Sequence, residues 1–185
     1  ESVDKSFNMV SVDMDTSTSD MAVIMANGLA GDVNGKKFQT ALDYVCIELA
    51  KKIAKDGEGA TKLIEAAVMH AVTAEDARKI AKSVISSNLV KCAIFGNDPN
   101  WGRILCAIGN SGAKFKEKLT DVYFDDLPIV QGGIAAKSNL KKIMNAMQKD
   151  TLKITIDLNN GNESATAYGC DMTFDYVKIN AHYST

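Results

Sequence analysis

The sequence predicts a layered domain of mixed α/β or α+β class, in which helices pack on a sheet. Apolar runs of strand length interleave with segments whose apolar residues recur every three or four positions, as in amphipathic helices. Residues 152–158 alternate apolar and polar side chains, and a turn at 159–162 leads into a candidate hairpin partner at 164–168. Such hairpins argue against a purely parallel sheet. With 185 residues, 46% of them hydrophobic, we expect one sizeable core and a single domain over residues 1–185.

The first third of the chain is expected to contain two strands and one long helix. Residues 7–12 alternate well enough for a strand, and the continuous apolar run at 21–26 is typical of a buried strand. The helix is the clearest element, because its apolar residues fall on one stripe, and Gly57 and Gly59 end it. The stripe consists of Phe38, Ala41, Leu42, Val45, Cys46, Leu49 and Ile53.

The rest of the chain continues to alternate between strands and helices. A strand over 61–72 precedes a helix opened by Thr73 and Asp76, which match a capping box in outline. Residues 171–183 are ambiguous between helix and strand. The other expected elements are a strand at 89–95, a helix at 101–108, short strands at 121–124 and 127–130, and a helix at 140–147.

Composition argues against several classes of partner. The net charge is −2, from 21 basic and 23 acidic residues, and 6% of residues are aromatic, which does not favour binding of nucleic acid or an anionic membrane. No apolar run approaches the roughly 20 residues that a membrane span needs. The cysteines lack zinc-site spacing, so we expect no metal and reduced thiols in a cytoplasmic protein. These cysteines are Cys46, Cys92, Cys106 and Cys170.

Two polar loops could carry chemistry. Residues 13–20 are dense in short oxygen-bearing side chains that could hold a hard cation, although the same residues favour an ordinary turn. In the second loop Glu58 stands between Gly57 and Gly59. A carboxylate on such a loop can reach into a cleft and pair with an ammonium group, but spacing alone favours an ordinary connection.

Two further clusters remain open between structure and function. The segment 96–103 is expected to connect a strand to a helix, with Asp98 as the helix cap, while Asn100 and Arg103 could face a ligand. The C-terminus is apolar and aromatic, so we expect it to dock and to bring Asn180 and Thr185 toward a pocket. Neither Gly-x-Ser-x-Gly nor His-Glu-x-x-His occurs, and the residues alone supply no complete active site.

Four stretches carry a resemblance to a known family: SFNMVSVDMDTSTSDMAVIMANGLAG, KDGEGATKLIE, VKCAIFGNDPNWGRILCAIGNSG and NESATAYGCDMTFDYVKINAHYST. From about Phe7 to Thr185 the sequence resembles the β-chain of the bifunctional glutamate N-acetyltransferase/ornithine acetyltransferase of arginine biosynthesis. The resemblance implies a self-cleaving, N-terminal-nucleophile-like fold. It also implies a ping-pong reaction, in which the β-chain's N-terminal threonine takes acetyl from N-acetylornithine and passes it to glutamate.

The resemblance implies roles for three residues of this sequence. Glu58 would pair with the amino group of the bound amino acid, while Asn180 and Thr185 would contact the polar end of that ligand. The sequence begins after the expected threonine, so we expect the nucleophile and the whole α-chain to lie outside it and the chain to be inactive alone. No metal or cofactor is implied, although acetyl-CoA is a possible co-substrate. The implied partners are the α-chain and further αβ units in a homo-oligomer.

Three positions depart from the family pattern: Met14 replaces Gly, Ser19 replaces Asn, and His182 replaces an acidic residue. Met14 is expected to change the local turn, because glycine adopts positive φ far more easily than methionine does. Two other functions stay open on sequence grounds. One is a related N-terminal-nucleophile amidase or aminopeptidase, which transfers the acyl group to water, and the other is a binding or scaffold domain without catalysis.

Overall fold

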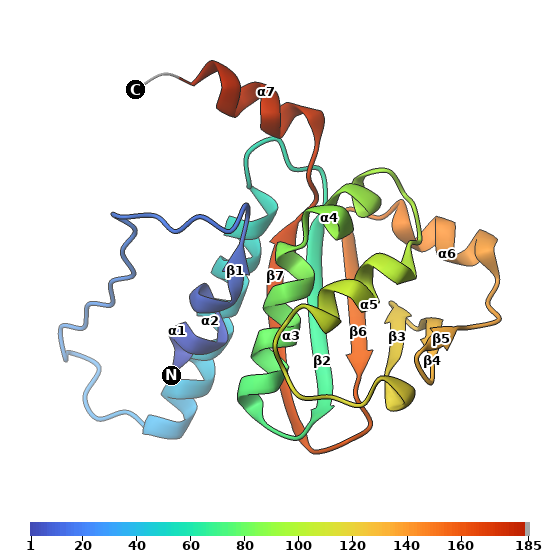
Figure 1. Ribbon diagram of the computed structural model, residues 1–185. Coiled ribbons are helices and arrows are strands. Elements are labelled where there is room, and N and C mark those ends of the chain that lie inside the picture. The colour runs from blue at the N-terminus through green and yellow to red at the C-terminus, as the bar shows by residue number, and fades with distance from the viewer. Residues whose placement is uncertain (184–185) are drawn as a thin grey trace.

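The computed structural model describes residues 1–183, which form one mixed sheet of seven strands with helices on both faces (Figure 1). The strand order is β1-β7-β2-β6-β3-β4-β5. The strands are β1 (Val10–Ser11), β2 (Leu63–Ala71), β3 (Asp121–Phe124), β4 (Leu127–Gln131), β5 (Ile134–Ala135), β6 (Thr151–Asp157) and β7 (Glu163–Cys170). The helices are α1 (Ser2–Lys5), α2 (Gly35–Lys55), α3 (Ala74–Ser86), α4 (Asn88–Phe95), α5 (Trp101–Gly109), α6 (Leu140–Met147) and α7 (Phe174–His182). The mixed class expected from the sequence is confirmed.

The centre of the sheet is β2, which runs parallel to β6 and antiparallel to β7. The expected hairpin between residues 152–158 and 164–168 is therefore wrong, since β2 lies between its two strands. The connection wraps the end of β2 instead: Leu158 N donates to Met69 O at 3.0 Å and Asn160 N donates to His70 O at 3.0 Å. Gly161 makes this possible, because a Cβ there would lie 2.1 Å from Ala71 O.

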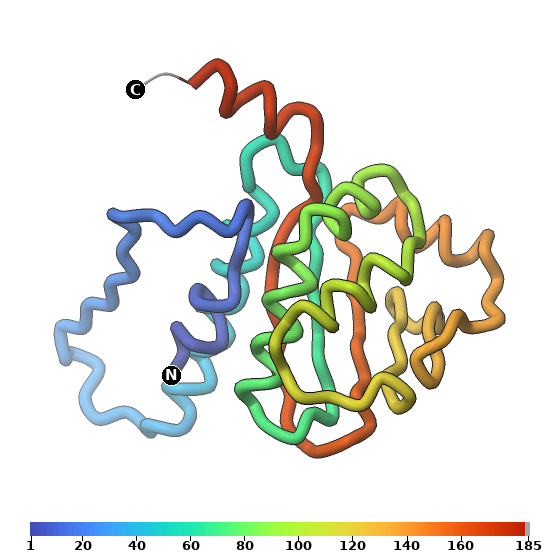
Figure 2. Tube along the Cα trace, in the orientation of Figure 1, coloured from blue at the N-terminus to red at the C-terminus, as the bar shows by residue number. Residues whose placement is uncertain are grey.

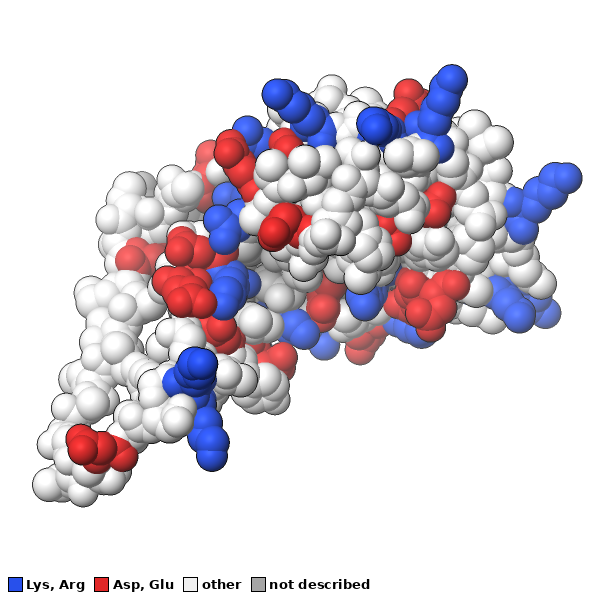
Figure 3. Space-filling model, turned by 90° about the horizontal axis from the view of Figure 1, so that it is seen from below, with Lys and Arg blue, Asp and Glu red and all other residues white. Residues whose placement is uncertain are grey.

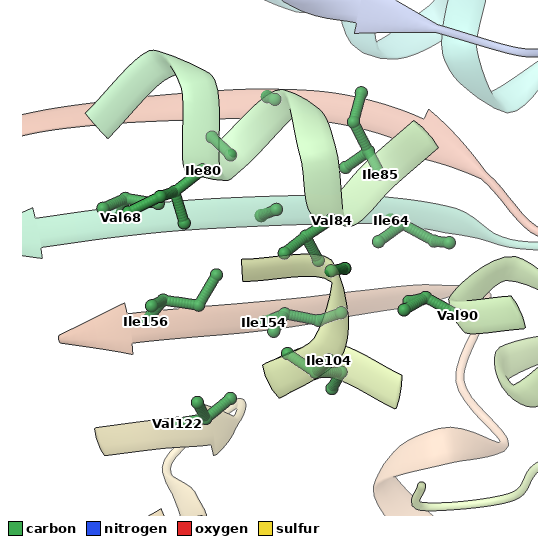
Figure 4. Packing of buried hydrophobic residues seen from close by; sticks show 14 of the residues in the cluster. Ile64, Val68, Ile80, Val84, Ile85, Val90, Ile104, Val122, Ile154 and Ile156 are labelled. Carbon is green, nitrogen blue, oxygen red and sulfur yellow. The ribbon is translucent and has the colours of Figure 1, made fainter. Parts of the chain in front are cut away.

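The main core lies between the sheet and α3, α4 and α5 (Figure 4). Alternate residues of β2 and β6 point to this face, as a two-residue period requires. They meet the apolar stripe of α3, and each fully buried aliphatic side chain stabilises the fold by about 1.5–3 kcal/mol. The labelled members of this layer are Ile64, Val68, Ile80, Val84, Ile85, Val90, Ile104, Val122, Ile154 and Ile156.

Helix α2 lies on the opposite face of the sheet, where Lys51 Nζ is 3.2 Å from the Glu65 carboxylate of β2. The helix is confirmed, but most of its expected apolar stripe is not in the core. Its packed face consists of small residues, Cys46, Ala50 and Ala54, which allow close approach to the sheet. The outer stripe, of which Leu49 is 46% exposed and Ile53 51% exposed, faces away.

A long segment, residues 12–34, leaves the body of the molecule between β1 and α2 (Figure 2). The buried strand expected at 21–26 is wrong, because Met21 is 81% exposed and Met25 is 91% exposed, and no regular structure forms there. Of the strand expected at 7–12, only Val10 and Ser11 pair, with β7. Apolar character alone did not show whether another surface of the chain covers this run.

Two other expectations are settled by helix caps. The apolar run 89–95 forms α4 rather than a strand, because the Ser87 side chain accepts from Val90 N and opens a helical turn. The ambiguous stretch 171–183 contains α7, capped by Thr173. The cap at Thr73 is confirmed, since Asp76 N donates to its hydroxyl at 3.1 Å. In the part of the chain that the structure describes, no helix has both the length and the apolarity to cross a bilayer.

Candidate functional site

The loop between α2 and β2 presents Glu58 to solvent at one end of the sheet. Helix α2 ends at Lys55, and the two glycines then bring the backbone close to neighbouring elements. Gly59 has φ +67°, and a Cβ there would lie 2.6 Å from Tyr176 N. A Cβ on Gly57 would lie 2.9 Å from Cys170 Sγ. Glycine is needed at both positions for the loop to approach β7 and α7 this closely.

The structure brings together Glu58 and Asn180, two residues expected at the site from the sequence. The Asn180 side-chain amide donates to Glu58 Oε2 at 2.7 Å and to Tyr176 O at 3.0 Å. The two residues are 122 positions apart in the sequence, so this contact depends on the tertiary fold. Thr185, the third expected residue, lies outside the described residues.

Helix α7 rests on this loop rather than on the main core. The expected docking of the C-terminus is therefore partial: Thr173 is buried, but Phe174 is 83% exposed and Val177 is 61% exposed. The Phe174 ring meets Phe95 of α4 edge to face, with centroids 5.7 Å apart. Glu58 and Asn180 are both exposed, and neither lines either of two open hollows along α2, one within residues 36–44 and one within residues 52–56.

A buried carboxylate holds the other side of the loop. Asp171 is 3% exposed and follows β7 directly. Its Oδ1 accepts from Thr61 N at 2.8 Å and from Lys62 N at 2.9 Å, and its Oδ2 accepts from the Thr61 hydroxyl. Nothing local in the sequence marked Asp171, because its partners lie about 110 residues earlier in the chain.

Two buried lysines support the same end of the sheet, and sequence reasoning missed both. Lys62 Nζ donates to Asn97 Oδ1 at 2.6 Å and to two backbone carbonyls. Burial lowers the pKa of Lys62, and the Asp171 charge opposes that effect. Lys91 Nζ donates to Val12 O at 2.6 Å and to the carbonyl of the last residue of β7. A lysine inside the apolar run of α4 was the available signal for Lys91.

The 13–20 cluster forms a turn joined to α7. Tyr176 donates its hydroxyl to Asp13 Oδ2 at 3.0 Å, and desolvation, helped by this bond, raises the pKa of Tyr176 to about 12. Asp15 N donates to Asp13 Oδ1 at 3.0 Å, the local bond expected of a turn. Met14 keeps the left-handed backbone that a glycine would adopt, at φ +80°. Among the described residues, no group of three or more His, Cys, Asp or Glu side chains could hold a metal ion.

The polar side chains of the 96–103 segment that were candidates for ligand binding make hydrogen bonds within the chain instead. Asn100, not Asp98 as expected, caps α5, because its Oδ1 accepts from Arg103 N at 3.3 Å. The Arg103 guanidinium donates to Leu89 O at 2.9 Å. Asn97, at φ +54°, accepts from the buried Lys62. These side chains join α4, α5 and the start of β2 into one unit behind the Glu58 loop.

Comparison with solved structures defines the class of the protein. The fold matches the crystal structure of an arginine biosynthesis bifunctional protein from Bacillus halodurans, with a TM-score of 0.94 and 41% sequence identity over 98% of this chain and 89% of that chain. This places the chain among the layered sheet-and-helix domains of that enzyme type, as the sequence resemblance implied.

Residues 1–185 match the ArgJ family. The chain is 50% identical to a glutamate N-acetyltransferase of Methanocaldococcus jannaschii over 99% of its own length and 48% of the relative's. It is also 48% identical to an arginine biosynthesis bifunctional protein of Symbiobacterium thermophilum, again over 48% of that relative. The chain belongs to the ArgJ family, and it spans about half the length of the curated relatives it matches.

Proposed function

We propose that this chain provides substrate-binding residues of an acetyltransferase that moves acetyl from N-acetylornithine to glutamate. The observation that carries the proposal is the Glu58–Asn180 contact of 2.7 Å, at an exposed edge of the molecule. It supports the roles that family membership suggests for these two residues. Thr185 is proposed as a third contact to the polar end of the substrate.

Glu58 is suited to bind an ammonium group. Asn180 donates to one oxygen of the carboxylate, so it orients the group and leaves the other oxygen to accept from a substrate. Charge-assisted hydrogen bonds of this kind are about twice as strong as neutral ones. Because both side chains are exposed in this chain, a second polypeptide surface is needed to exclude water around them.

The proposed reaction proceeds through an acyl-enzyme. A threonine outside this chain attacks the acetyl carbonyl of N-acetylornithine, ornithine leaves, and the amino group of glutamate then takes the acetyl group from the threonine oxygen. The N-terminal amine of that threonine can act as its base, and oxyanion donors would come from the other chain. The mechanism needs no metal or cofactor, and acetyl-CoA stays a possible alternative donor.

The proposed partners are the remaining half of the family's polypeptide, as an α-chain, and further copies of the resulting αβ unit. Two apolar surfaces support this proposal: the outer stripe of α2 and residues 21–31 of the projecting segment. Seen from below, acidic and basic side chains are interspersed over the body, whereas the projecting segment at the left is mostly uncharged (Figure 3). Residues 21–31 carry no charged side chain. The proposed location is the cytoplasm, where the four free cysteines would stay reduced.

Reconstitution with the remaining half of the family's polypeptide tests the function. The assembly should transfer acetyl from N-acetylornithine to glutamate, and Glu58→Ala should raise KM for N-acetylornithine by about tenfold or more, the value of one charge-assisted bond. Glu75→Ala, which removes an exposed carboxylate paired with Lys79 on α3, is the control and should behave as wild type. Wild-type KM and kcat in the Glu58→Ala assembly would contradict the site assignment.

The same assembly separates transfer from hydrolysis. In an acetyltransferase, acetyl-enzyme formed from N-acetylornithine persists until glutamate is added. In an amidase of related chemistry, it decays in water at the turnover rate whether or not glutamate is present. Rapid decay without glutamate would therefore favour the hydrolase alternative.

A further inference from the structure

Glu58 and Asn180 stand on two exposed segments that have few other supports. Glu58 lies on the loop after α2, and Asn180 lies in the second turn of α7, a helix without a buried residue. For the two side chains to meet at 2.7 Å, something must fix the loop and the helix relative to each other. The only described segment that hydrogen-bonds to both is the connection from β7 to α7, residues 171–173.

The first residue of this connection fixes the loop just after Glu58. Asp171 is 3% exposed, and its two oxygens accept the amides of Thr61 and Lys62 and the Thr61 hydroxyl. Its own amide donates to Lys62 O at 3.2 Å, so the contact is reciprocal. A carboxylate with three donors in a buried position holds its partners to one geometry, because a displaced oxygen would leave amides unsatisfied.

Thr173 joins the same loop to the helix that carries Asn180. Its hydroxyl donates to Gly59 O at 2.7 Å and accepts from Tyr176 N at 3.2 Å, as the N-cap of α7. This single hydroxyl therefore fixes the position of the backbone next to Glu58 relative to the first turn of α7. The side chain is 6% exposed, so packing also fixes its rotamer.

We propose that Asp171 is a positioning residue for the acetyl transfer: together with Thr173 it holds the Glu58 loop in register with α7, so that Glu58 and Asn180 form one substrate contact. This inference rests on the proposed function. Asp171 does not touch the substrate and acts through Glu58. The substrate amino group is bound in the ground state as well as during transfer, so misplacing Glu58 should weaken binding more than it slows the chemical step.

The test uses the reconstituted assembly with Asp171→Ala, which removes the oxygen that accepts from both backbone amides. KM for N-acetylornithine should rise by about tenfold, while kcat per acylatable threonine changes less than about threefold. Thr173→Val should act in the same direction, and Thr173→Ser, which keeps the hydroxyl, should restore a near-normal KM. Asp121→Ala is the matched control, because Asp121 also accepts a loop amide, from Gly132 at 2.8 Å, at the start of β3.

A double-variant cycle shows whether Asp171 acts through Glu58. If it does, adding Asp171→Ala to Glu58→Gln raises KM no further than Glu58→Gln alone. Multiplying effects, or a loss of melting temperature with KM unchanged, would show a structural role only and overturn the inference. Glu58→Gln with a normal KM would instead overturn the proposed function itself.

Hydrogen exchange provides a readout independent of activity. In Asp171→Ala, the amides of Thr61 and Lys62 should exchange at least tenfold faster, since they lose their acceptor. The amides of residues 64–68, bonded within the sheet, should keep their protection. Unchanged exchange at 61 and 62 would contradict the assigned role of Asp171.

Discussion

The two faces of the sheet differ in how far this chain can complete them. The face under α3, α4 and α5 is closed by side chains of the same chain, and its aliphatic residues are fully buried. The face with α2 is covered by the small residues Cys46, Ala50 and Ala54 and by partly buried side chains such as Ile47. Beyond them the chain exposes an apolar helix stripe and the segment 12–34. One face is a closed core, whereas the other leaves apolar side chains exposed, as an interface with the proposed partner would require.

The largest expected effect on stability comes from comparing one isoleucine on each face of the sheet. Ile154→Ala, in β6 under α3, should destabilise the chain by about 2–5 kcal/mol, because it leaves a cavity at a fully buried site. Ile53→Ala, on the outer stripe of α2, should change stability by no more than about 0.5 kcal/mol. Urea unfolding of the chain measures both. Equal losses would show that the α2 stripe is already packed.

Ile53→Ala, which should hardly affect the stability of the isolated chain, should have a clear effect on binding to the proposed partner. The Ile53→Ala chain should bind the remaining half of the family's polypeptide more weakly than wild type, by about 1–3 kcal/mol if the side chain is buried at the interface. Isothermal titration or a pull-down series measures this. Wild-type affinity would remove the stripe from the proposed interface.

Two glycines with similar backbones allow a sharper comparison. Gly59 and Gly31 have φ +67° and +72°, so alanine is strained at both. A Cβ at Gly59 also meets Tyr176 N at 2.6 Å, whereas nothing lies within 4 Å of one at Gly31. Gly59→Ala should therefore cost about 2–4 kcal/mol, and Gly31→Ala about 1 kcal/mol. Thermal melts of the two variants measure this difference in stability. If Gly59→Ala lost no more stability than Gly31→Ala, the Glu58 loop would be packed less closely against α7 than the structure shows.

The difference between the two faces of the sheet also explains which parts of the fold could be predicted from the sequence. Helix α2, β2 and β6 were found because their periodicity or apolar runs extend over many residues. Residues 21–26 were misread because an apolar run has the same appearance whether its cover is this chain or another. The apolar run of α4 was misread because it is short, and a run of that length does not distinguish strand from helix.

Only part of the candidate site could be predicted from the sequence, because some of its residues are marked by their neighbours in sequence and others are not. Glu58 was visible because its flanking glycines are local. Asn180 was marked weakly by its place in an apolar terminus, and more firmly by the family resemblance. Asp171 and Lys91 were missed, because their partners are distant in sequence and a lone Asp or Lys has no pattern of its own.

The smallest expected effect concerns the one side-chain bond that links α7 to the root of the projecting segment. Tyr176→Phe removes the donor to Asp13 and should cost about 1 kcal/mol at neutral pH. In the folded chain the pKa of Tyr176 is raised to about 12, against an ordinary value of 10.0, so the unfolded chain loses this proton first as the pH rises. The contribution of Tyr176 is thus complete below about pH 10 and is lost as the pH rises through about 12.

The stability advantage of wild type over Tyr176→Phe should accordingly shrink between about pH 10 and pH 12, as urea unfolding at a series of pH values would show. Tyr44→Phe, at an exposed tyrosine of α2, is the control for general alkaline effects. If the advantage of wild type stayed constant over that range, the Tyr176–Asp13 bond would not persist in solution. The root of the projecting segment would then be held by its link to β1, where Met14 N donates to Ser11 Oγ, and by the bond from Lys91 Nζ to Val12 O. Contact with the proposed partner would have to fix the rest of its position.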